Sequence, residues 1–558
     1  MNEEMIHIFY NGEILTFDQG NSKVNAMAIF QDKILTIGME VEVRREVEKF
    51  LKSYNRTHPN KIKVQETDLG GTCIVPGFID AHMHPGLYII FKTQLDLSGV
   101  RSYAELEDIL KKEDQRLEPG KWILGLKLME ETFKDPVERR FPNRYDLDKM
   151  CSSRPILIFR YDGHICVVNS AVLEIIGINA TTLKKFTSIS GEIKVDSGGN
   201  PTGIFTEGAM SLILDKMPSP DIQQLQEAAK KVSTELASFG ITTCGGIIQA
   251  GEEGPAGKAG AIELALIEAL IREDLLEQDY VFYIITDKPK KLKRLRKSIS
   301  KLNKEPNRFV VGGIKLFADG TFGASTAYMF EPFADSPNGT CGFMVHEKEE
   351  LYKLAKETFE LGFQIACHTI GDKANRIVVD MFQDLLKGFE GKARQCRIEH
   401  ASQLTREVIT DIADLGLILV CQPAFINSEY TWLEKRLGPK RIRYTYPFRS
   451  LIDAGVLIAG ASDAPVESAN VFKAIQACVT RNGFVVEEVI PTIEALRMFT
   501  INAAYALGQE TIKGSLEKGK LADFLILKQN PISLPSEQLG MIQILTTYHR
   551  GKPIYLAE

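Results

Sequence analysis

Apolar runs and amphipathic stretches alternate along most of the chain. From Gly71 onward, short runs of mostly apolar residues are separated by longer stretches in which apolar residues recur every three or four positions. The short runs have the pattern of strands buried on both faces, and the longer stretches have the pattern of helices with one buried face. Their alternation predicts parallel β–α units and hence an α/β fold.

Eight of these apolar runs are strand candidates, which is the number that a closed (β/α)8 barrel requires. In chain order they are CIVPGFID, GITTCGGI, DYVFYIIT, FVVGGIKLF, FQIACH, RQCRIEH, LGLILVC and GVLIAGASD. We therefore predict a (β/α)8 TIM barrel over residues 71–509.

A further apolar run lies in the long stretch between the first and second barrel candidates. This run, RPILIFRYDGHICVVNSAVL, would make a ninth strand if it belonged to the barrel. Long insertions in such barrels commonly lie in the loops that follow the strands. Residues 91–230 are therefore predicted to form an insertion over the barrel mouth.

The two ends of the chain have a different pattern, in which short strands are separated by turn residues. Near the start, IHIFYNGEILTF carries Asn11-Gly12 between two apolar runs, the usual sign of a tight hairpin. Near the end, GKLADFLILKQNP and IQILTTYHRGKPIYLAE are strand-like with Gly and Pro turns. Because chain ends often lie close together, residues 1–70 and 510–558 are predicted to form one small β-sandwich.

Composition mainly argues against certain classes of protein. The 558-residue chain is 44% hydrophobic and 25% charged, as in ordinary globular proteins. Its net charge of −6 argues against a nucleic-acid surface. The N-terminus does not have the pattern of a secretory signal, and no apolar run reaches the roughly 18 residues of a membrane span. We expect a cytoplasmic protein with a small-molecule substrate and with no nucleic-acid or membrane partner, and leave open whether it is a homodimer.

Histidine is the residue type that first points to chemistry. The segment PGFIDAHMHPG places His82 and His84 at the end of the first barrel candidate. Side chains two apart in a strand share a face, so the two imidazoles would form half of a metal site. Taken alone, such a pair also arises by chance as surface or core histidines, and more ligands are needed.

Further ligand types occur at other predicted strands, on or just after the apolar runs. They are Lys315 in GGIKLFADG, His368 in FQIACHTIGD, His400 in RIEHASQ and Asp463 in IAGASDAPVE. Each alone could be a capping or solvated residue, or an ion-pair partner in the case of Lys315. Because active sites in these barrels lie at the C-terminal ends of the strands, their joint occurrence favours one concave metal site.

These motifs resemble the amidohydrolase superfamily. Its barrel carries His-x-His on strand one, a carboxylated lysine on strand four, single histidines on strands five and six, and an aspartate on strand eight. A closer similarity is to the YtcJ-like subgroup, which includes N-substituted formamide deformylases, and it covers nearly the whole chain. The segments that carry it are PGFIDAHMH, RYDGH, KLFADGTFGASTA, HTIGDKA, RIEHASQ, SDAPV and GKLADFLIL.

The resemblance implies a set of metal ligands. Four of these ligands are also expected to be catalytic, namely Lys315, His368, His400 and Asp463. The full set is His82, His84, Lys315, His368, His400 and Asp463. One or two ions would bind, with Lys315 bridging a pair as a carbamate formed from CO₂. Zn²⁺ suits these ligands and lowers the pKa of its bound water to about 7, which makes a hydroxide nucleophile available. Mn²⁺ and Fe²⁺ stay alternatives. Asp463 would be the general base.

Substrate contacts are a separate expectation from the same resemblance. The residues that match the subgroup are Arg160, Asp162, His164, Glu207 and Asp319. They would line the substrate pocket, or those in the insertion would instead attach the insertion to the barrel.

Two motifs depart from the subgroup pattern. Ser325 stands where the subgroup tends to have arginine, and Asn470-Val471 stands where Asp-Pro is usual. Because both departures could reshape the pocket, the resemblance does not identify the substrate.

The implied activity is hydrolysis of an amide-type C–N bond, N-formyl or N-acyl, in a small molecule by the metal-activated hydroxide. A lactonase or other ester hydrolase is an alternative, because the same nucleophile attacks either carbonyl. A catalytically silent barrel that acts as a scaffold is a third reading, since fold alone does not prove activity. Losses at the ligand positions would be its signature, and the sequence shows none.

Overall fold

The computed structural model describes residues 5–20, 22–58, 62–160, 165–186, 192–214, 216–218, 220–251, 260, 262–336, 339–389 and 391–557. The chain forms two compact units. The larger consists of Met1–Tyr88 and Val232–Glu558, and the smaller of Ile89–Lys231.

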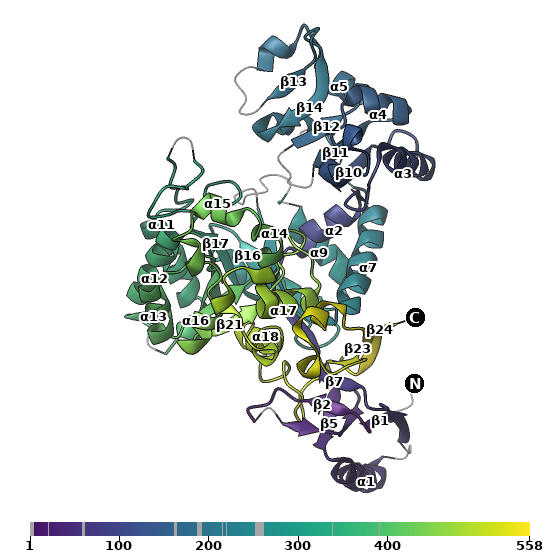
Figure 1. Cartoon of the computed structure of the whole chain (residues 1–558). Helices are drawn as coiled ribbons and strands as arrows, with labels where there is room; N and C mark the ends of the chain where they lie inside the picture. The colour runs from purple at the N-terminus through teal and green to yellow at the C-terminus, as the bar shows by residue number, and fades with distance from the viewer. Residues whose placement is uncertain are drawn as a thin grey trace. The chain divides into compact units, whose positions relative to one another are not determined.

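The larger unit is built on an eight-stranded sheet whose neighbouring strands are all parallel (Figure 1). The strands follow one another in sequence order, as in a (β/α)8 barrel. They are β8 (Phe78–Met83), β15 (Ile241–Gln249), β16 (Asp279–Ile285), β17 (Phe309–Phe317), β18 (Gln364–Thr369), β19 (Cys396–His400), β20 (Ile418–Cys421) and β21 (Leu457–Gly460). The predicted fold class is confirmed.

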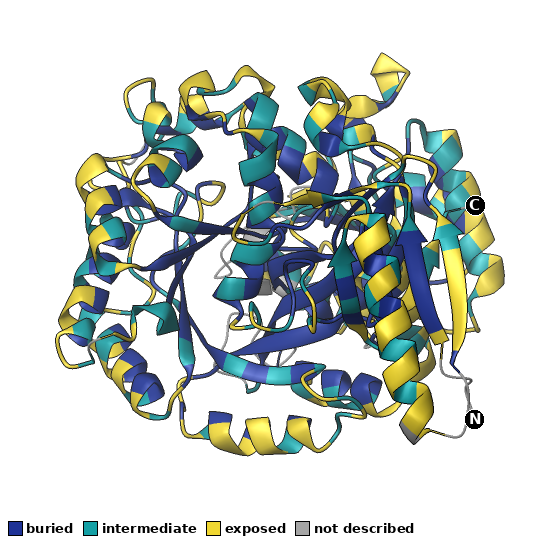
Figure 2. Cartoon of the chain, turned by 90° about the horizontal axis from the view of Figure 1, so that it is seen from below, coloured by how far each residue is buried: buried dark blue, intermediate teal, exposed yellow. Residues whose placement is uncertain are grey.

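Helices alternate with these strands and bury one face each. They include α9 (Glu263–Arg272), α10 (Lys291–Ser300), α11 (Lys348–Glu360), α12 (Asp372–Leu386), α13 (Arg406–Leu415), α16 (Phe448–Asp453), α17 (Val471–Thr480) and α18 (Thr492–Met498). In α10, Leu292, Leu295 and Ile299 are buried, three and four positions apart, while the lysines and arginines between them face outward. Figure 2 shows the buried strands and the exposed outer faces of the helices.

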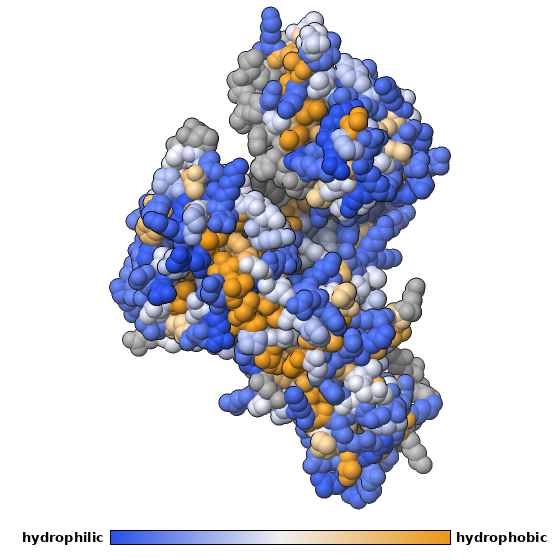
Figure 3. Space-filling view, in the orientation of Figure 1, coloured by the Kyte–Doolittle hydropathy of each residue, from blue (hydrophilic) through white to orange (hydrophobic). Residues whose placement is uncertain are grey.

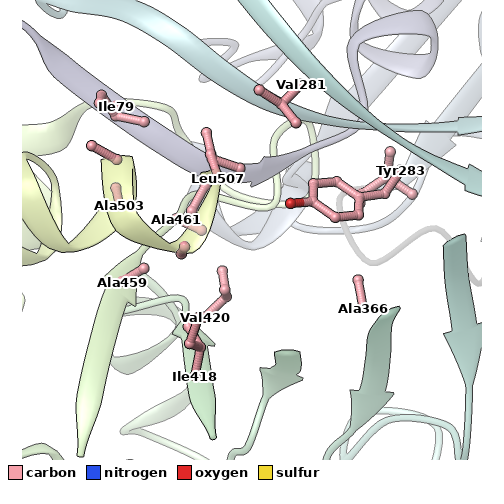
Figure 4. Close-up of a cluster of buried hydrophobic side chains, with 14 of the residues drawn as sticks. Ile79, Val281, Tyr283, Ala366, Ile418, Val420, Ala459, Ala461, Ala503 and Leu507 are labelled. Atoms are coloured by element: carbon pink, nitrogen blue, oxygen red, sulfur yellow. The ribbon is translucent and has the colours of Figure 1, made fainter. Parts of the chain in front are cut away.

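The barrel interior is filled by side chains from most of its strands and from α19 (Ile501–Ala506). Figure 4 shows Val281 and Tyr283 from β16, and Val420 from β20, turned toward this cluster. Small residues such as Ala366 leave room for the larger ones. The interior is therefore a packed core, and the site must lie at an end of the barrel.

The first barrel candidate, CIVPGFID, proves to be two strands. Residues Cys73–Pro76 form β7 in a different sheet, and β8 begins at Phe78. At the break, Gly77 N donates to Asp523 O, whereas Phe78 N donates to Gly240 O. A Cβ atom on Gly77 would lie 2.6 Å from the Thr242 side chain, so only glycine fits at this crossing. The apolar run is continuous because both strands are buried.

Both ends of the chain contribute to one six-stranded sheet of the larger unit, in the order β24-β23-β22-β7-β2-β3. Its members besides β7 are β2 (Glu13–Leu15), β3 (Lys23–Val24), β22 (Phe524–Leu527), β23 (Ile544–His549) and β24 (Lys552–Leu556). A four-stranded sheet contains β1 (Met5–Tyr10), β4 (Ala26–Phe30), β5 (Lys33–Gly38) and β6 (Lys63–Asp68), with α1 (Glu40–Thr57) beside it. Phe9, Ile14 and Phe524 share one apolar cluster between the sheets.

The hairpin predicted at Asn11-Gly12 is wrong. Strand β1 pairs with β4 and β6, whereas β2 pairs with β3 and β7, so the chain changes sheets at this turn. Asn11 does adopt the left-handed conformation typical of turns, with φ of 60°. Its side chain donates to Asp68, the last residue of the neighbouring strand β6. The local turn signal was correct, but it does not specify which strands pair.

The smaller unit has its own six-stranded sheet, in the order β13-β14-β12-β11-β10-β9. The strands are β9 (Leu95–Asp96), β10 (Ile123–Leu128), β11 (Ile156–Arg160), β12 (Ile165–Val168), β13 (Ile193–Val195) and β14 (Pro201–Thr206), with helices α3 (Tyr103–Arg116), α4 (Arg144–Met150) and α5 (Ser170–Ile176). The additional apolar run of the sequence thus forms β11 and β12 here, outside the barrel sheet. Its position over the barrel mouth stays a prediction.

Hydrophobic surface is unevenly distributed. In the view of Figure 3 most of the surface is hydrophilic, and hydrophobic residues gather around α16–α18 of the larger unit. Val466 and Val486, from the segments between α16 and α18, are 63% and 53% exposed. No helix among the described residues is both long enough and apolar enough to cross a membrane.

Candidate metal centre

His82 and His84 come from the end of β8, where the strand is irregular. Four residues of β8, from Asp80 to Met83, stand opposite three of β15, from Cys244 to Gly246, which is the pattern of a β-bulge. A bulge turns a side chain away from the direction that regular alternation would give it. His82 is fully buried, and the side chain of His84 is 19% exposed.

Asp463 faces both histidines from the segment after β21. Its Oδ1 lies 3.3 Å from His82 Nε2 and 3.1 Å from His84 Nε2. Its backbone has a φ of 60°, which is unusual for a residue other than glycine. Two backbone hydrogen bonds hold it there, from Asp463 N to His82 O and from His84 N to Ala464 O, both 2.8 Å. The ends of the first and last barrel strands are thereby joined.

His368 and His400 lie at the C-terminal ends of the neighbouring strands β18 and β19. Their ring centres lie 4.5 Å apart, and the ring centre of His400 is 5.1 Å from that of His82. The four histidines are therefore contiguous. Burial lowers the pKa of His368 to about 3 and that of His400 well below its usual value. Both are neutral at physiological pH, which is the form that binds metals.

Lys315 lies on the neighbouring strand β17 and has unusual surroundings for a lysine. It is 2% exposed, and its Nζ has no hydrogen-bond partner among the described residues. Burial lowers its pKa to about 8, against the opposing effect of the negative charges of Glu399 and Asp463. The neutral amine is the form that can react with CO₂, so the environment suits a carbamate.

Residues behind the histidines orient the rings. His82 Nδ1 lies 2.5 Å from Glu399 Oε2 and His400 Nδ1 lies 2.8 Å from Gln422 Oε1. Because both oxygens are acceptors, each Nδ1 carries the proton and each Nε2 keeps a lone pair. His368 has the opposite arrangement, since its Nε2 lies 3.1 Å from the carbonyl oxygen of Gly320.

The carboxylate of Glu399 is itself held by Arg397. Arg397 Nε donates to Glu399 Oε1 at 2.9 Å, and Arg397 Nη2 donates to Ala81 O across the barrel at 3.0 Å. Burial would raise the pKa of Glu399, but the charge of Arg397 and the bond from His82 hold it well below its usual range. Sequence reasoning missed this pair. Its signal was two opposite charges alternating within the buried run RQCRIEH.

The buried atoms of this cluster that have no hydrogen-bond partner suit a bound metal ion. His82 Nε2, Asp463 Oδ1 and Lys315 Nζ are buried without a hydrogen-bond partner among the described residues. The contacts of Asp463 with the two histidines are short but do not have hydrogen-bond geometry. Neutral imidazoles and a carboxylate around unpaired buried atoms are a donor set suited to zinc.

Comparison with known proteins places this geometry in a family. Residues 65–555 match the model of the Amidohydrolase family. The chain belongs to the amidohydrolase family. The assignment makes the protein a hydrolase and confirms the resemblance seen in the sequence motifs.

Relatives of known name agree with this assignment. The chain is 30% identical over 505 residues to YtcJ of Bacillus subtilis (strain 168), named as a candidate amidohydrolase, covering 88% of this chain and 91% of the relative. It is 26% identical to the N-substituted formamide deformylase of Arthrobacter pascens, covering 97% and 96% of the two chains. Among solved structures, an uncharacterized metal-dependent hydrolase from Pyrococcus horikoshii OT3 aligns with a TM-score of 0.73 and 25% identity, covering 95% of this chain and 99% of that one.

Within this amidohydrolase, Asp319 has a defined set of contacts. Its Oδ2 accepts hydrogen bonds from the backbone N–H groups of Tyr328 and Gly371, and its Oδ1 accepts one from that of Ile370. Burial raises the pKa of Asp319 to about 7. Asp319 thus joins the loop after β17 to the end of β18, and its predicted contact with substrate stays a prediction.

The other predicted substrate contacts belong to the smaller unit. Arg160 ends β11 and forms ion pairs with Glu130 and Glu131. Glu207 begins a short 3₁₀ helix, and its side chain lies outside the described part of the structure. Asp162 and His164 also lie outside the described residues. The roles of all four in substrate binding stay predictions.

Ser325 and Asn470, which depart from the subgroup pattern, both accept hydrogen bonds in the structure. The hydroxyl of Ser325 accepts a hydrogen bond from Arg436, which also donates to Phe322 O at 2.8 Å. An arginine from a distant segment therefore holds this loop. Asn470 caps α17, because its Oδ1 accepts from Lys473 N at 3.0 Å.

Proposed function

We propose that the protein is a metal-dependent hydrolase of an amide-type C–N bond in a small molecule. Zn²⁺ is the proposed metal, and N-formyl and N-acyl compounds are the proposed substrates. The observation that carries the proposal is the cluster of unpaired, buried ligand atoms at the ends of the barrel strands. The similarity to an N-substituted formamide deformylase supports the choice of bond.

The proposed metal ligands are those expected from the sequence. They are His82, His84, Lys315, His368, His400 and Asp463. Lys315 would serve as a carbamate, and the burial of its amine without a hydrogen-bond partner among the described residues supports this role. Bound zinc would polarise the substrate carbonyl and make an attacking water acidic enough to react at neutral pH.

The remaining steps depend on side chains of the chain itself. The Arg397–Glu399 pair keeps the proton of His82 on Nδ1 and so leaves Nε2 for the metal. Asp463, whose carboxylate lies nearest to His82 and His84, would take a proton from the attacking water. It would then return this proton to the leaving nitrogen.

The first experiment combines metal analysis of the purified protein with a hydrolysis screen. The screen contains N-formyl and N-acyl amines, each beside the ester of matching shape, and a set of lactones. We expect bound transition metal and preferential hydrolysis of amides. Preferential hydrolysis of esters or lactones would instead support the alternative ester hydrolase, and a metal-free protein without any hydrolytic activity would contradict both.

Two substitutions separate the proposed roles of Lys315 and Asp463. Lys315→Ala should lower the metal content, and acetate or propionate with excess metal should restore part of the activity. Asp463→Asn should keep most of the metal while kcat falls by at least about 100-fold, the typical effect of losing a general base. Asp384→Asn, at an exposed carboxylate on α12, is the control and should change neither. Near-normal turnover by Asp463→Asn, on a substrate whose C–N cleavage limits the rate, would refute the proton-transfer role.

A further inference from the structure

A cavity of about 490 Å³ adjoins Lys315 and His368. This volume is within the range of small-molecule sites. Its apolar walls come from the end of β16, from β17, from the loop that follows β17 and from α11. The apolar residues are Ile285, Leu316, Phe317, Val345 and Leu354. The cavity therefore suits an apolar substituent of a substrate whose reacting bond lies at the cluster.

His346 lines the same cavity and belongs to none of the family motifs quoted above. Its segment is attached to the end of β17, because Val345 N donates to Ala318 O at 2.7 Å and His346 Nδ1 lies 2.8 Å from Phe317 O. A carbonyl oxygen only accepts, so Nδ1 carries the proton. In the neutral ring, Nε2 is then a hydrogen-bond acceptor.

Several other polar groups on the cavity wall already have partners. Asp319 accepts three backbone N–H groups, and Thr286 Oγ1 accepts from Lys288 N at 3.2 Å. Thr321 Oγ1 accepts from Ala324 N at 3.3 Å. For His346 Nε2, by contrast, no hydrogen bond or ion pair is found among the described residues. It is an open acceptor on a largely apolar wall.

We propose that His346 is a specificity-determining residue that accepts a hydrogen bond from the substrate through Nε2. The substrate class is an amide whose apolar, aromatic-sized substituent carries an N–H or O–H donor. The inference rests on the proposed function for the location of the reacting bond. The acceptor atom of His346 and the cavity are observed in the structure and do not depend on the proposed function.

The test compares N-formylanilines with a para hydroxyl, a para methoxy group or hydrogen. The hydroxyl can donate to Nε2, whereas the methoxy group cannot. A net hydrogen bond contributes about 1 kcal/mol, so we expect wild-type kcat/KM to favour the hydroxyl over the methoxy compound by about five- to tenfold. The methoxy compound is larger by one methyl group, and the compound with hydrogen shows how kcat/KM responds to size alone at this position.

Two variants distinguish specificity from a structural role. His346→Gln places an amide near the position of Nε2 but lacks the donor at Nδ1, and it should keep most of the preference for the hydroxyl. His346→Asn places its amide near Nδ1, can still donate to Phe317 O, and should lose the preference. If anchoring of the segment were the only role, Asn would preserve function and Gln would impair it. His58→Phe, at a histidine just after α1 that is stacked on Tyr54, is the control.

A binding measurement separates failure of this inference from failure of the proposed function. Calorimetry with 4-aminophenol and 4-methoxyaniline, products of the same series, needs no turnover. If no anilide is hydrolysed but wild type and His346→Gln bind 4-aminophenol more tightly than His346→Asn does, the amide assignment fails and the role of His346 stands. Hydrolysis or binding with the same hydroxyl preference in all three proteins, or with none in wild type, would overturn the role of His346.

Discussion

Two buried clusters at opposite ends of the barrel have similar residue types and different surroundings. The mouth cluster consists of His82, His84 and Asp463, and the base cluster consists of Asp279, Asp523 and His549. In each, the ligand atoms lie within 4.8 Å of one another, so either could hold a cation by residue type alone.

The base cluster already contains its counter-charges. Lys513 Nζ lies 2.6 Å from Asp279 Oδ2 and 3.0 Å from Asp523 Oδ2, and Arg550 Nη2 donates to Asp279 Oδ2 at 2.9 Å. Burial would raise the pKa of Asp279, but the charges of Lys513, His549 and Arg550 hold it far below its usual range.

The mouth cluster instead retains unpaired buried atoms. No hydrogen bond from lysine or arginine reaches its three residues in the part of the chain that the structure describes. The comparison teaches that nearby ligand types do not define a metal site. What differs at the mouth is that Asp463 Oδ1 has no hydrogen-bond partner among the described residues and so stays available to an ion.

The largest expected effect follows from removing the chain segment that supplies the cations of the base cluster. Deletion of residues 510–558 removes Lys513, Asp523 and Arg550, leaves Asp279 buried without its partners, and exposes the edge of β7. Such an edge and the uncovered apolar surface favour aggregation. We expect insoluble protein, as measured by the soluble fraction after expression. A soluble and fully active truncation would contradict the predicted packing of residues 510–558 with the N-terminal strands.

The next effect comes from removing one charge of the base cluster. Asp279→Asn leaves Lys513 and Arg550 buried without full compensation and should lower the free energy of unfolding by about 3–5 kcal/mol. Urea titration measures it, and Asp274→Asn, at a 45% exposed carboxylate, is the matched control with an expected loss below about 1 kcal/mol.

The pH dependence of this variant gives a second check. The folded-state pKa of Asp279 is depressed, so its contribution to stability is complete above the ordinary aspartate pKa. The contribution is lost as the pH falls below about 4. The stability difference between wild type and Asp279→Asn should therefore shrink below that pH. A difference that does not change with pH would contradict the ion-pair explanation.

A smaller effect distinguishes the two clusters as metal sites. Zn²⁺ at 100 times its dissociation constant should raise the free energy of unfolding of the metal-free wild type by about 2.7 kcal/mol. His84→Ala at the mouth should reduce this gain, whereas His549→Ala at the base should keep it, because the cations beside Asp279 exclude a metal. Thermal unfolding with and without zinc measures both. The opposite result would assign the metal to the base cluster.

Much of this organisation could be predicted because it depends on local periodicity. The barrel strands appear as buried runs, and the end of a run marks the end of a strand. His368 and His400 could therefore be assigned to neighbouring strand ends before the fold was known. Lys315 could likewise be assigned to the fourth barrel strand from the order of the runs. Among the predicted barrel strands, only the first, CIVPGFID, was wrong. Gly77 separates two buried strands there, and a single glycine does not interrupt the apolar pattern.

What the sequence by itself determined is the type and order of the elements and the residue types at their ends. Tertiary structure alone decided which distant groups became partners. Glu399 orients His82 although 317 positions separate them, and Lys513 neutralises Asp279 from 234 positions away. The change of sheets at Asn11 is of the same kind. Hydrophobic periodicity is a property of neighbouring residues, whereas the pairing of buried charges depends on which strands the closed barrel brings together.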